Sequence, residues 1–307
     1  MDASSRARAS MGLDTLAIIG GAGPEAGVDL MQKILMKNRE LREKTDGLHY
    51  CTDRDAPYVV LFQVPGLGGP RNPDDLIDEE QEPFRLVWDS ITDTIRKIDA
   101  LQLDYFCISC NTLHVLAPRV RRFCEENSVS AKFVSIVDTV YARIRDIHQE
   151  ASVACGAGDD SSAPFRIAVF GTFATTDLKS ARSPYGGLLS PETILTPVGE
   201  DSQASQQRPL YPVFLPEGAR SDLQRLIVDI KREGLQDKHA VHFRDEFLHK
   251  YKADCALLAC TELPMLMPYI NKLSTPSEIE RASSSCTFLD ATDLLADVLV
   301  HKLLRFK

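Results

Sequence analysis

Two cysteines stand at matching places in the sequence. Cys110 comes six residues after Asp104, with an apolar run between them, and Cys260 has the same relation to Asp254. The two cysteines are 150 positions apart, and so are the two aspartates. Such a repeat predicts two similar halves, each with one cysteine just after an apolar segment.

Two thiols can carry out acid–base chemistry that one cannot. The pKa of a free cysteine is about 8.5, and its surroundings can lower it toward neutrality. One thiol could remove a proton from one face of a carbon while the other returns a proton to the opposite face, which is racemisation. We expect a helix to start after each cysteine, so that its N–H groups stabilise a thiolate. With the hydroxyls of Thr112 and Thr261, these groups could hold a substrate carboxylate.

The elements that position the cysteines alternate between strands and helices. Short apolar runs predict strands, and an amphipathic stretch or a proline after a glycine turn predicts a helix. The expected strands are 16–19, 58–62, 105–109, 166–170 and 255–259, and the expected helices are 25–37 and 82–100. This alternation predicts an α/β fold with mostly parallel sheets, in which ligands bind at the carboxyl ends of strands.

The repeat also predicts how the chain divides. We expect two pseudo-symmetric α/β domains with the active site in the cleft between them. The first would comprise residues 13–150 and 287–307, and the second residues 151–286. Residues 1–12 are expected to form a disordered leader, and residues 152–163, rich in Gly, Ser and Asp, a linker.

Composition limits the classes of partner. The formal net charge of −9 argues against nucleic acid or an anionic membrane as partner. No segment approaches the roughly 18 uninterrupted apolar residues that a membrane span needs. Eight irregularly spaced cysteines, without a secretory signal, favour a reducing, cytoplasmic setting over a disulfide framework.

Two motifs resemble a redox or zinc pair and a dinucleotide-binding turn, and we interpret neither of them in that way. Cys107 and Cys110 form a C-x-x-C pair, but Cys107 lies inside an apolar strand and no second pair completes a zinc site. We interpret Cys107 as a core residue, with a redox sensor as the distant alternative. Residues 21–27 nearly match a dinucleotide fingerprint, but the last spacing is one residue too long. We expect no metal and no cofactor.

Three segments together resemble a known family. They are Gly20–Pro24, Cys110–His114 and Ala259–Glu262, and they resemble the aspartate/glutamate racemase superfamily, most of all its aspartate racemase branch. The resemblance extends from about Leu16 to the last helix. It implies a homodimeric racemase that uses no pyridoxal phosphate and acts on a small acidic amino acid, with aspartate as the first expectation.

The resemblance also implies roles for particular residues. The catalytic pair would be Cys110 and Cys260. The residues expected to hold the α-carboxylate are Gly23, Asn111, Thr112 and Thr261. The side-chain carboxylate would meet Arg71 and one cation in the second half. There an alignment on Gly234 favours Arg232 over its neighbour Lys231.

Two further residues have two interpretations each. His114 could assist Cys110 as base or orienting group, or could cap or pack at a helix start. Glu262 could polarise Thr261 or Cys260, or could favour a helix N-terminus electrostatically. For the whole chain, the alternatives are a broad-specificity amino-acid racemase and a decarboxylase, isomerase or amino-acid-binding relative. Because single-cysteine forms are usual among those relatives, two cysteines favour the racemase.

Overall fold

A computed structural model of the chain describes residues 14–46, 53–68, 76, 78–154, 163–180, 182–186, 209–275 and 286–304. The chain folds as two compact units. One consists of residues 1–139 and 292–307, and the other of residues 140–291. The boundary between them falls inside one helix, α5 (Ile136–Ala154).

The first unit contains a parallel sheet with the strand order β2-β1-β3-β4. Its strands are β1 (Thr15–Gly20), β2 (Tyr58–Gln63), β3 (Tyr105–Ile108) and β4 (Lys132–Val134). Its α-helices are α2 (Ala26–Asp46), α3 (Glu82–Ala100) and α4 (Ala117–Glu126), with most of α11 (Ala291–Leu303). Its 3-10 turns are Asp53–Asp55, Pro65–Leu67 and Thr112–Leu116.

The second unit repeats this topology, with the parallel order β6-β5-β7-β8. Its strands are β5 (Phe165–Gly171), β6 (Leu210–Val213), β7 (Cys255–Ala259) and β8 (Thr287–Asp290). Its helices are α7 (Glu217–Glu233), α8 (Asp237–Phe243), the π-helical turn Arg244–Leu248, the 3-10 turn Pro264–Leu266 and α9 (Met267–Leu273). The predicted α/β fold with two similar parallel sheets is confirmed.

Three element boundaries differ from the prediction. Helix α2 continues to Asp46 instead of ending at Lys37, because good helix formers follow after the apolar periodicity ends. Helix α5 reaches Ala154 and so enters the segment expected to be a linker. Strand β8, expected in the first domain, pairs with β7, where Cys255 and Thr287 are partners in the ladder. A strand pairing of this kind is non-local and leaves no mark on the local sequence.

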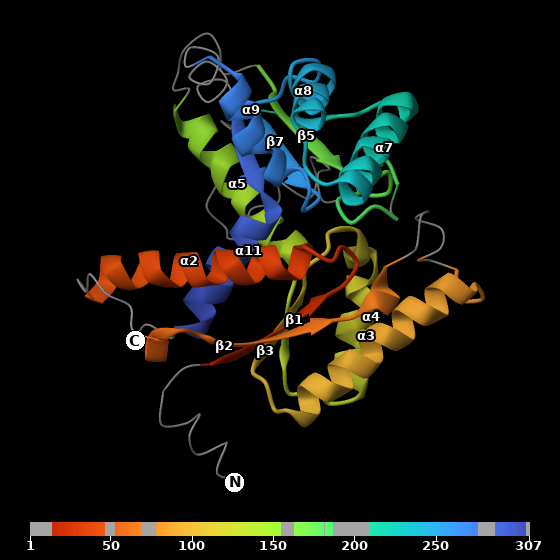
Figure 1. Cartoon of the computed structure of the whole chain (residues 1–307), viewed down its shortest axis with the longest axis vertical. Helices are drawn as coiled ribbons and strands as arrows, with labels where there is room; N and C mark the ends of the chain where they lie inside the picture. The colour runs from red at the N-terminus through yellow and green to blue at the C-terminus, as the bar shows by residue number, and fades with distance from the viewer. Residues whose placement is uncertain are drawn as a thin grey trace. The chain divides into compact units, whose positions relative to one another are not determined.

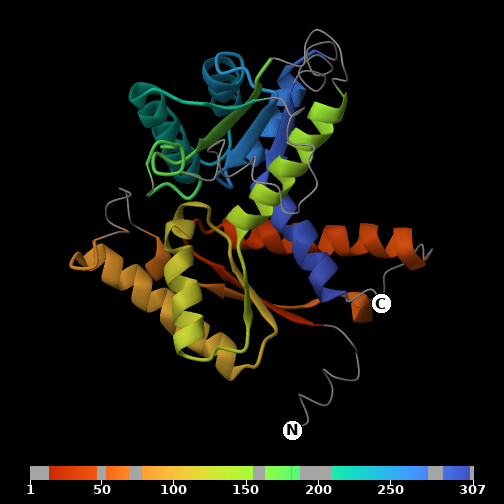
Figure 2. The same ribbon diagram turned by 180° about the vertical axis from the view of Figure 1, so that it is seen from behind.

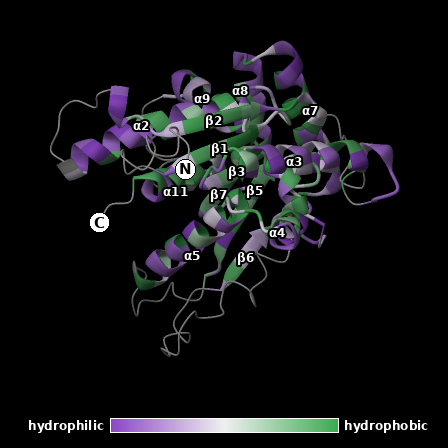
Figure 3. Ribbon diagram, turned by 90° about the horizontal axis from the view of Figure 1, so that it is seen from below, coloured by the Kyte–Doolittle hydropathy of each residue, from purple (hydrophilic) through white to green (hydrophobic). Residues whose placement is uncertain are grey.

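Each sheet has helices packed on its faces. In the first unit, α3 presents apolar side chains spaced three and four residues apart to β1 and β3, and α4 adds to the same core. Helix α2 packs on β1 and β2 from the other side, as Figure 1 and Figure 2 show, and its Leu30 and Ile34 are fully buried. Apolar strands and helices with polar outer faces are visible in the hydropathy colouring of Figure 3.

The second core repeats the arrangement with different residues. Helix α7 contributes Leu223, Ile227 and Ile230, and the rings of Phe243 and Phe247 lie edge-on to Phe170 of β5. A large apolar area is therefore buried behind the strands that end near Cys260. None of the described helices is both long and apolar enough to cross a membrane.

The repeated aspartates have the same structural role. Oδ2 of Asp104 accepts hydrogen bonds from the backbone N–H (2.8 Å) and the hydroxyl (2.7 Å) of Thr15. Oδ2 of Asp254 accepts a hydrogen bond from the backbone N–H of Arg166 at 2.7 Å. Each carboxylate thus ties the start of one central strand to the start of its neighbour. This fixes the register of the two strands and so determines where the following cysteine emerges.

Candidate active site

Both cysteines lie at the carboxyl edge of their sheet. Cys110 comes two residues after the end of β3, and Cys260 comes directly after β7. The ladder pairs Ile108 with Ile19 and Ala259 with Gly171. Cys110 is half-buried and Cys260 is 7% exposed. The two thiols therefore occupy equivalent positions in two sheets of the same topology. Each follows a strand that pairs with the other central strand of its sheet.

The segment after each cysteine is a 3-10 turn and not an α-helix. The N–H of His114 bonds to the carbonyl of Asn111, and the N–H of Leu263 to that of Cys260, each at 3.0 Å. Helices α4 and α9 begin seven residues after their cysteines, each with a proline in its first turn. The helix start expected after each cysteine is thus a 3-10 turn, and the α-helix follows later. That the N–H groups of this turn stabilise a thiolate stays a prediction.

His114 links the Cys110 segment to the start of α5. Its Nδ1 is 2.7 Å from the Cys110 carbonyl oxygen, and the N–H of Ile136 donates to its Nε2 at 3.2 Å. The neutral tautomer with the proton on Nδ1 satisfies both bonds. Burial lowers the pKa of His114 to about 4, and the ring stacks on Phe133. Burial thus keeps His114 neutral, and its two hydrogen bonds favour the interpretation as a group that orients the cysteine loop and caps α5 over that of a base.

We expect the buried His114 to make the protein less stable in mild acid. The pKa in the folded state, about 4, lies below the ordinary value of 6.5, so unfolding takes up a proton at acidic pH. Stability is fully present above pH 6.5 and falls as pH approaches 4, by about 3 kcal/mol in total. Urea unfolding of the wild type and of His114→Gln at pH 7.5 and 4.5 measures this. A wild type that loses no more stability than the variant between these pH values would contradict it.

The carboxylate of Glu262 connects the predicted residues of the second half. Its Oε2 accepts hydrogen bonds from Sγ of Cys260 (2.8 Å) and from the hydroxyl of Thr261 (3.0 Å). Its Oε1 is 3.3 Å from Nζ of Lys231 on α7. Glu262 is only 6% exposed. The structure thus brings four of the predicted residues into one hydrogen-bonded cluster, which we call the Glu262 cluster: Lys231, Cys260, Thr261 and Glu262.

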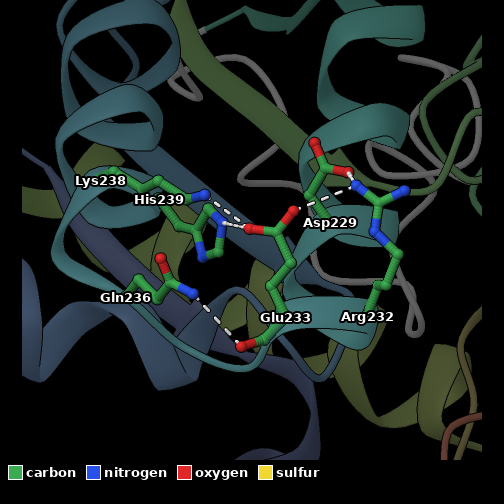
Figure 4. Close-up of polar contacts among 6 residues, drawn as sticks. All are labelled: Asp229, Arg232, Glu233, Gln236, Lys238 and His239. Carbon is green, nitrogen blue, oxygen red and sulfur yellow. Dashed lines mark hydrogen bonds and ion pairs between the residues drawn. The ribbon is translucent and has the colours of Figure 1, made fainter.

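Arg232 contacts acidic residues of its own helix, as Figure 4 shows. Its guanidinium is 2.8 Å from Asp229 and 3.1 Å from Glu233, and its side chain is 68% exposed against 35% for Lys231. Consecutive helix residues are turned about 100° apart, so only one of the two cations can face Glu262. Lys231 is therefore the cation that contacts Glu262, and which of the two cations faces a substrate stays a prediction.

Helix α7 also contacts the loop that follows β5, a feature not anticipated from the sequence. Oε1 of Gln224 accepts a hydrogen bond from the N–H of Phe173 at 2.9 Å. The guanidinium of Arg220 stacks on the Phe173 ring at 4.3 Å and pairs with Asp177 at 3.0 Å. Arg220, Gln224 and Lys231 follow one stripe of the helix. In the sequence, the available signal for this contact was the line of polar residues between the apolar positions of the helix.

A second group not anticipated is the set of hydroxyls beside Cys260. Thr172 follows Gly171, the ladder partner of Ala259, and so lies next to Cys260 along the sheet edge. The hydroxyls of Thr172 and Thr175 are 2.8 Å apart. Three threonines within the five residues after an apolar strand were the available signal.

In the first half, Asn111 is buried and Thr112 half-buried in the turn after Cys110. Gly23 is buried in the turn before α2, where its carbonyl accepts a hydrogen bond from Ala26 at 3.1 Å. Arg71, the predicted cation of this half, lies outside the described residues, as does the predicted leader. In the described part of this half, Asn111 and Thr112 thus follow Cys110 directly along the chain, and Gly23 lies in the turn after β1.

The other cysteines in the described ranges behave as core or packing residues. Cys107 is fully buried in β3, and burial raises the pKa of its thiol far above the usual range. Burial also raises the pKa of Cys255 to about 12 and that of Cys124 and Cys286 to about 11. Within the described residues, no group of three or more His, Cys, Asp or Glu side chains is placed to hold a metal ion.

The chain is thus an α/β protein of two topologically equivalent units, with one thiol at the same sheet edge in each. No family model matches the sequence. Solved structures with this fold include an aspartate racemase from Picrophilus torridus, with a TM-score of 0.58 and 18% identity over 94% of this chain and 93% of that one. A candidate Asp/Glu racemase from Yersinia pestis gives a TM-score of 0.60 at 14% identity, over 95% of this chain and 100% of that one. An aspartate racemase homologue from Pyrococcus horikoshii OT3 gives 0.52 at 14% identity, also over 95% and 100%.

Proposed function

We propose that the protein racemises an acidic amino acid without a cofactor, with aspartate as the first candidate. The observation that carries the proposal is the equivalent position of Cys110 and Cys260 at the carboxyl edges of two topologically identical sheets. The similarity of fold to a solved aspartate racemase and to a candidate Asp/Glu racemase supports the same class of reaction.

The reaction needs one thiolate and one thiol at a time. The thiolate takes the α-proton of the bound enantiomer and becomes a thiol. The other thiol gives its proton to the opposite face of the carbon and becomes a thiolate. The product leaves with inverted configuration, and the two sulfurs have exchanged their protonation states. Polar groups near each cysteine would hold the α-carboxylate and the negative charge that develops on it: Gly23, Asn111, Thr112 and Thr261.

The preference for an acidic side chain rests on cations. Lys231 is one, and its contact with the buried Glu262 supports a place at the site. Arg71 stays a prediction from the sequence. In the alternative in which a single thiol serves a decarboxylase or isomerase, the second cysteine would need no equivalent position, so the repeat favours racemisation.

Deuterium exchange at the α-carbon tests the function directly. L- and D-amino acids are incubated with the protein in D2O, and NMR measures loss of the α-proton while chiral chromatography measures inversion. Aspartate should exchange and invert, and alanine and serine should do so much more slowly. Equal turnover of neutral and acidic amino acids would refute the acidic preference, and a decarboxylated product would refute the reaction.

We expect Lys231→Met to lose far more activity on aspartate than Arg232→Met. Removing Lys231 leaves a substrate carboxylate without a partner, which costs a few kcal/mol, or roughly 100-fold in kcat/KM. Arg232 has its own acidic partners on α7 and serves as the matched control. Steady-state kinetics on aspartate measure kcat/KM for both variants. Equal losses of kcat/KM would contradict a role of Lys231 in binding the substrate carboxylate.

A further inference from the structure

Glu262 places a carboxylate where a thiolate would have to form. Its Oε2 lies 2.8 Å from Sγ of Cys260, and both groups are more than nine-tenths buried. Two negative charges at this distance in a buried site repel each other strongly, so the pair keeps one proton between its two atoms. The question is which of the two atoms holds the proton.

The groups that face Glu262 decide this. Lys231 from α7 is 3.3 Å from Oε1, and Thr261 donates to Oε2. Lys231 and Thr261 thus both meet the carboxylate oxygens of Glu262. Of the strands on either side of β7, β5 is followed by Thr172, a hydroxyl, and β8 ends in Asp290, a second acidic residue at the same edge. Apart from Lys231, the groups named here add no positive charge for a Cys260 thiolate.

We propose that, in the substrate-free protein, the proton of this pair sits on Cys260 and that the negative charge of Glu262 holds it there. Glu262 thereby acts as a positioning residue that sets the protonation state of one thiol, and Lys231 pairs with its carboxylate. Resting on the proposed function, this makes Cys260 the proton donor of the resting enzyme and leaves the first proton abstraction to Cys110. In the first half the residue at the position of Glu262 is Thr112, which carries no charge, so the two thiols differ in kind.

The pH dependence of alkylation tests this without any substrate. The full-length protein is treated with iodoacetamide at pH 6 to 10, and peptide mass spectrometry measures the rate at Cys260. Glu262→Gln removes the like charge and offers an amide N–H, so the rate at pH 7.5 should rise about tenfold, corresponding to a pKa lower by roughly one unit. Lys231→Met removes a cation, so the rate should fall several-fold.

Opposite changes from two neighbours of one carboxylate are not expected from a loss of structure. Arg232→Met, on the same helix and bonded elsewhere, should leave the Cys260 rate unchanged. The rates at Cys124 and Cys286 report whether the fold is intact in each variant. A Cys260 rate that is unchanged or slower in Glu262→Gln, with those two rates constant, overturns the proposal. Alkylation requires no turnover. A protein that racemises nothing would therefore refute the proposed function, while the alkylation rates would still test the role of Glu262.

Discussion

Replacing either Cys110 or Cys260 with Ala is expected to abolish racemisation in both directions. Each direction needs one thiolate and one thiol, so neither variant can complete the reaction. A positioned acid or base contributes about 10² to 10⁴ in rate, and loss of an obligatory partner should reach at least the upper part of this range. Ser variants should be almost as inactive, because a hydroxyl is a far weaker acid than a thiol.

The residual activity of these variants carries further information. The remaining cysteine can still remove a proton from the one enantiomer that presents its α-hydrogen to it. Each variant should therefore show slow exchange with D2O for one enantiomer, and the two variants should favour opposite ones. NMR of L- and D-aspartate in D2O measures both.

Cys107→Ala and Cys255→Ala are the controls, because both thiols are buried in strands and protonated at neutral pH. They should racemise normally apart from any loss of packing. If Cys110→Ala racemised normally and Cys107→Ala were inactive, the assignment of equivalent thiols would be wrong.

Gly21→Ala should destabilise the protein by on the order of 3 kcal/mol. Gly21 has φ of +121°, which an L side chain rarely adopts, and a Cβ there would lie 2.1 Å from the carbonyl oxygen of Val64. Because that oxygen belongs to the backbone, the whole turn after β1 would have to move. This turn leads to Gly23 and follows β1, which pairs with the strand that precedes Cys110, so we expect activity to fall together with stability. Urea unfolding and D2O exchange measure the two effects.

Gly218→Ala provides the matched control. Gly218 lies in the first turn of α7, and a Cβ there meets nothing within 4 Å. Alanine is a better helix former than glycine, so this variant should be unchanged or more stable by up to about 1 kcal/mol. Equal stability of the two variants would show that the turn after β1 adapts to a side chain.

The parts of the fold that were predictable are those set by local pattern. Apolar runs ending in glycine or cysteine located the central strands, and the repeated aspartates located the halves, since each makes a bond that the topology requires. The placement of β8 was not predictable, because it depends on pairing with a strand about thirty residues earlier. The type of helix after each cysteine was not predictable, because the hydrogen bonds of these turns span three residues instead of four.

The residue types of the candidate site were predictable from the sequence, but the orientations of some of its side chains were not. Both cysteines and their neighbours could be named, but the choice between Lys231 and Arg232 depends on the rotation of α7 about its axis. The two interpretations of His114 could not be separated from sequence, since the backbone N–H that meets its ring belongs to Ile136, 22 residues away. Such contacts are defined only when distant segments pack together.

The repeat of strand order in the two units is the pattern that duplication of a single gene segment leaves behind. In a protein built from two identical copies, every change near one thiol would also appear near the other. Fusion into one chain removes that constraint. Asn111 and Thr112 after one cysteine, and Thr261 and Glu262 after the other, are residues that two formerly identical sites can acquire only once they are inherited separately. The aspartates at the opposite edge are the same in both units, so the two units differ directly after the cysteines and agree where the strands are joined.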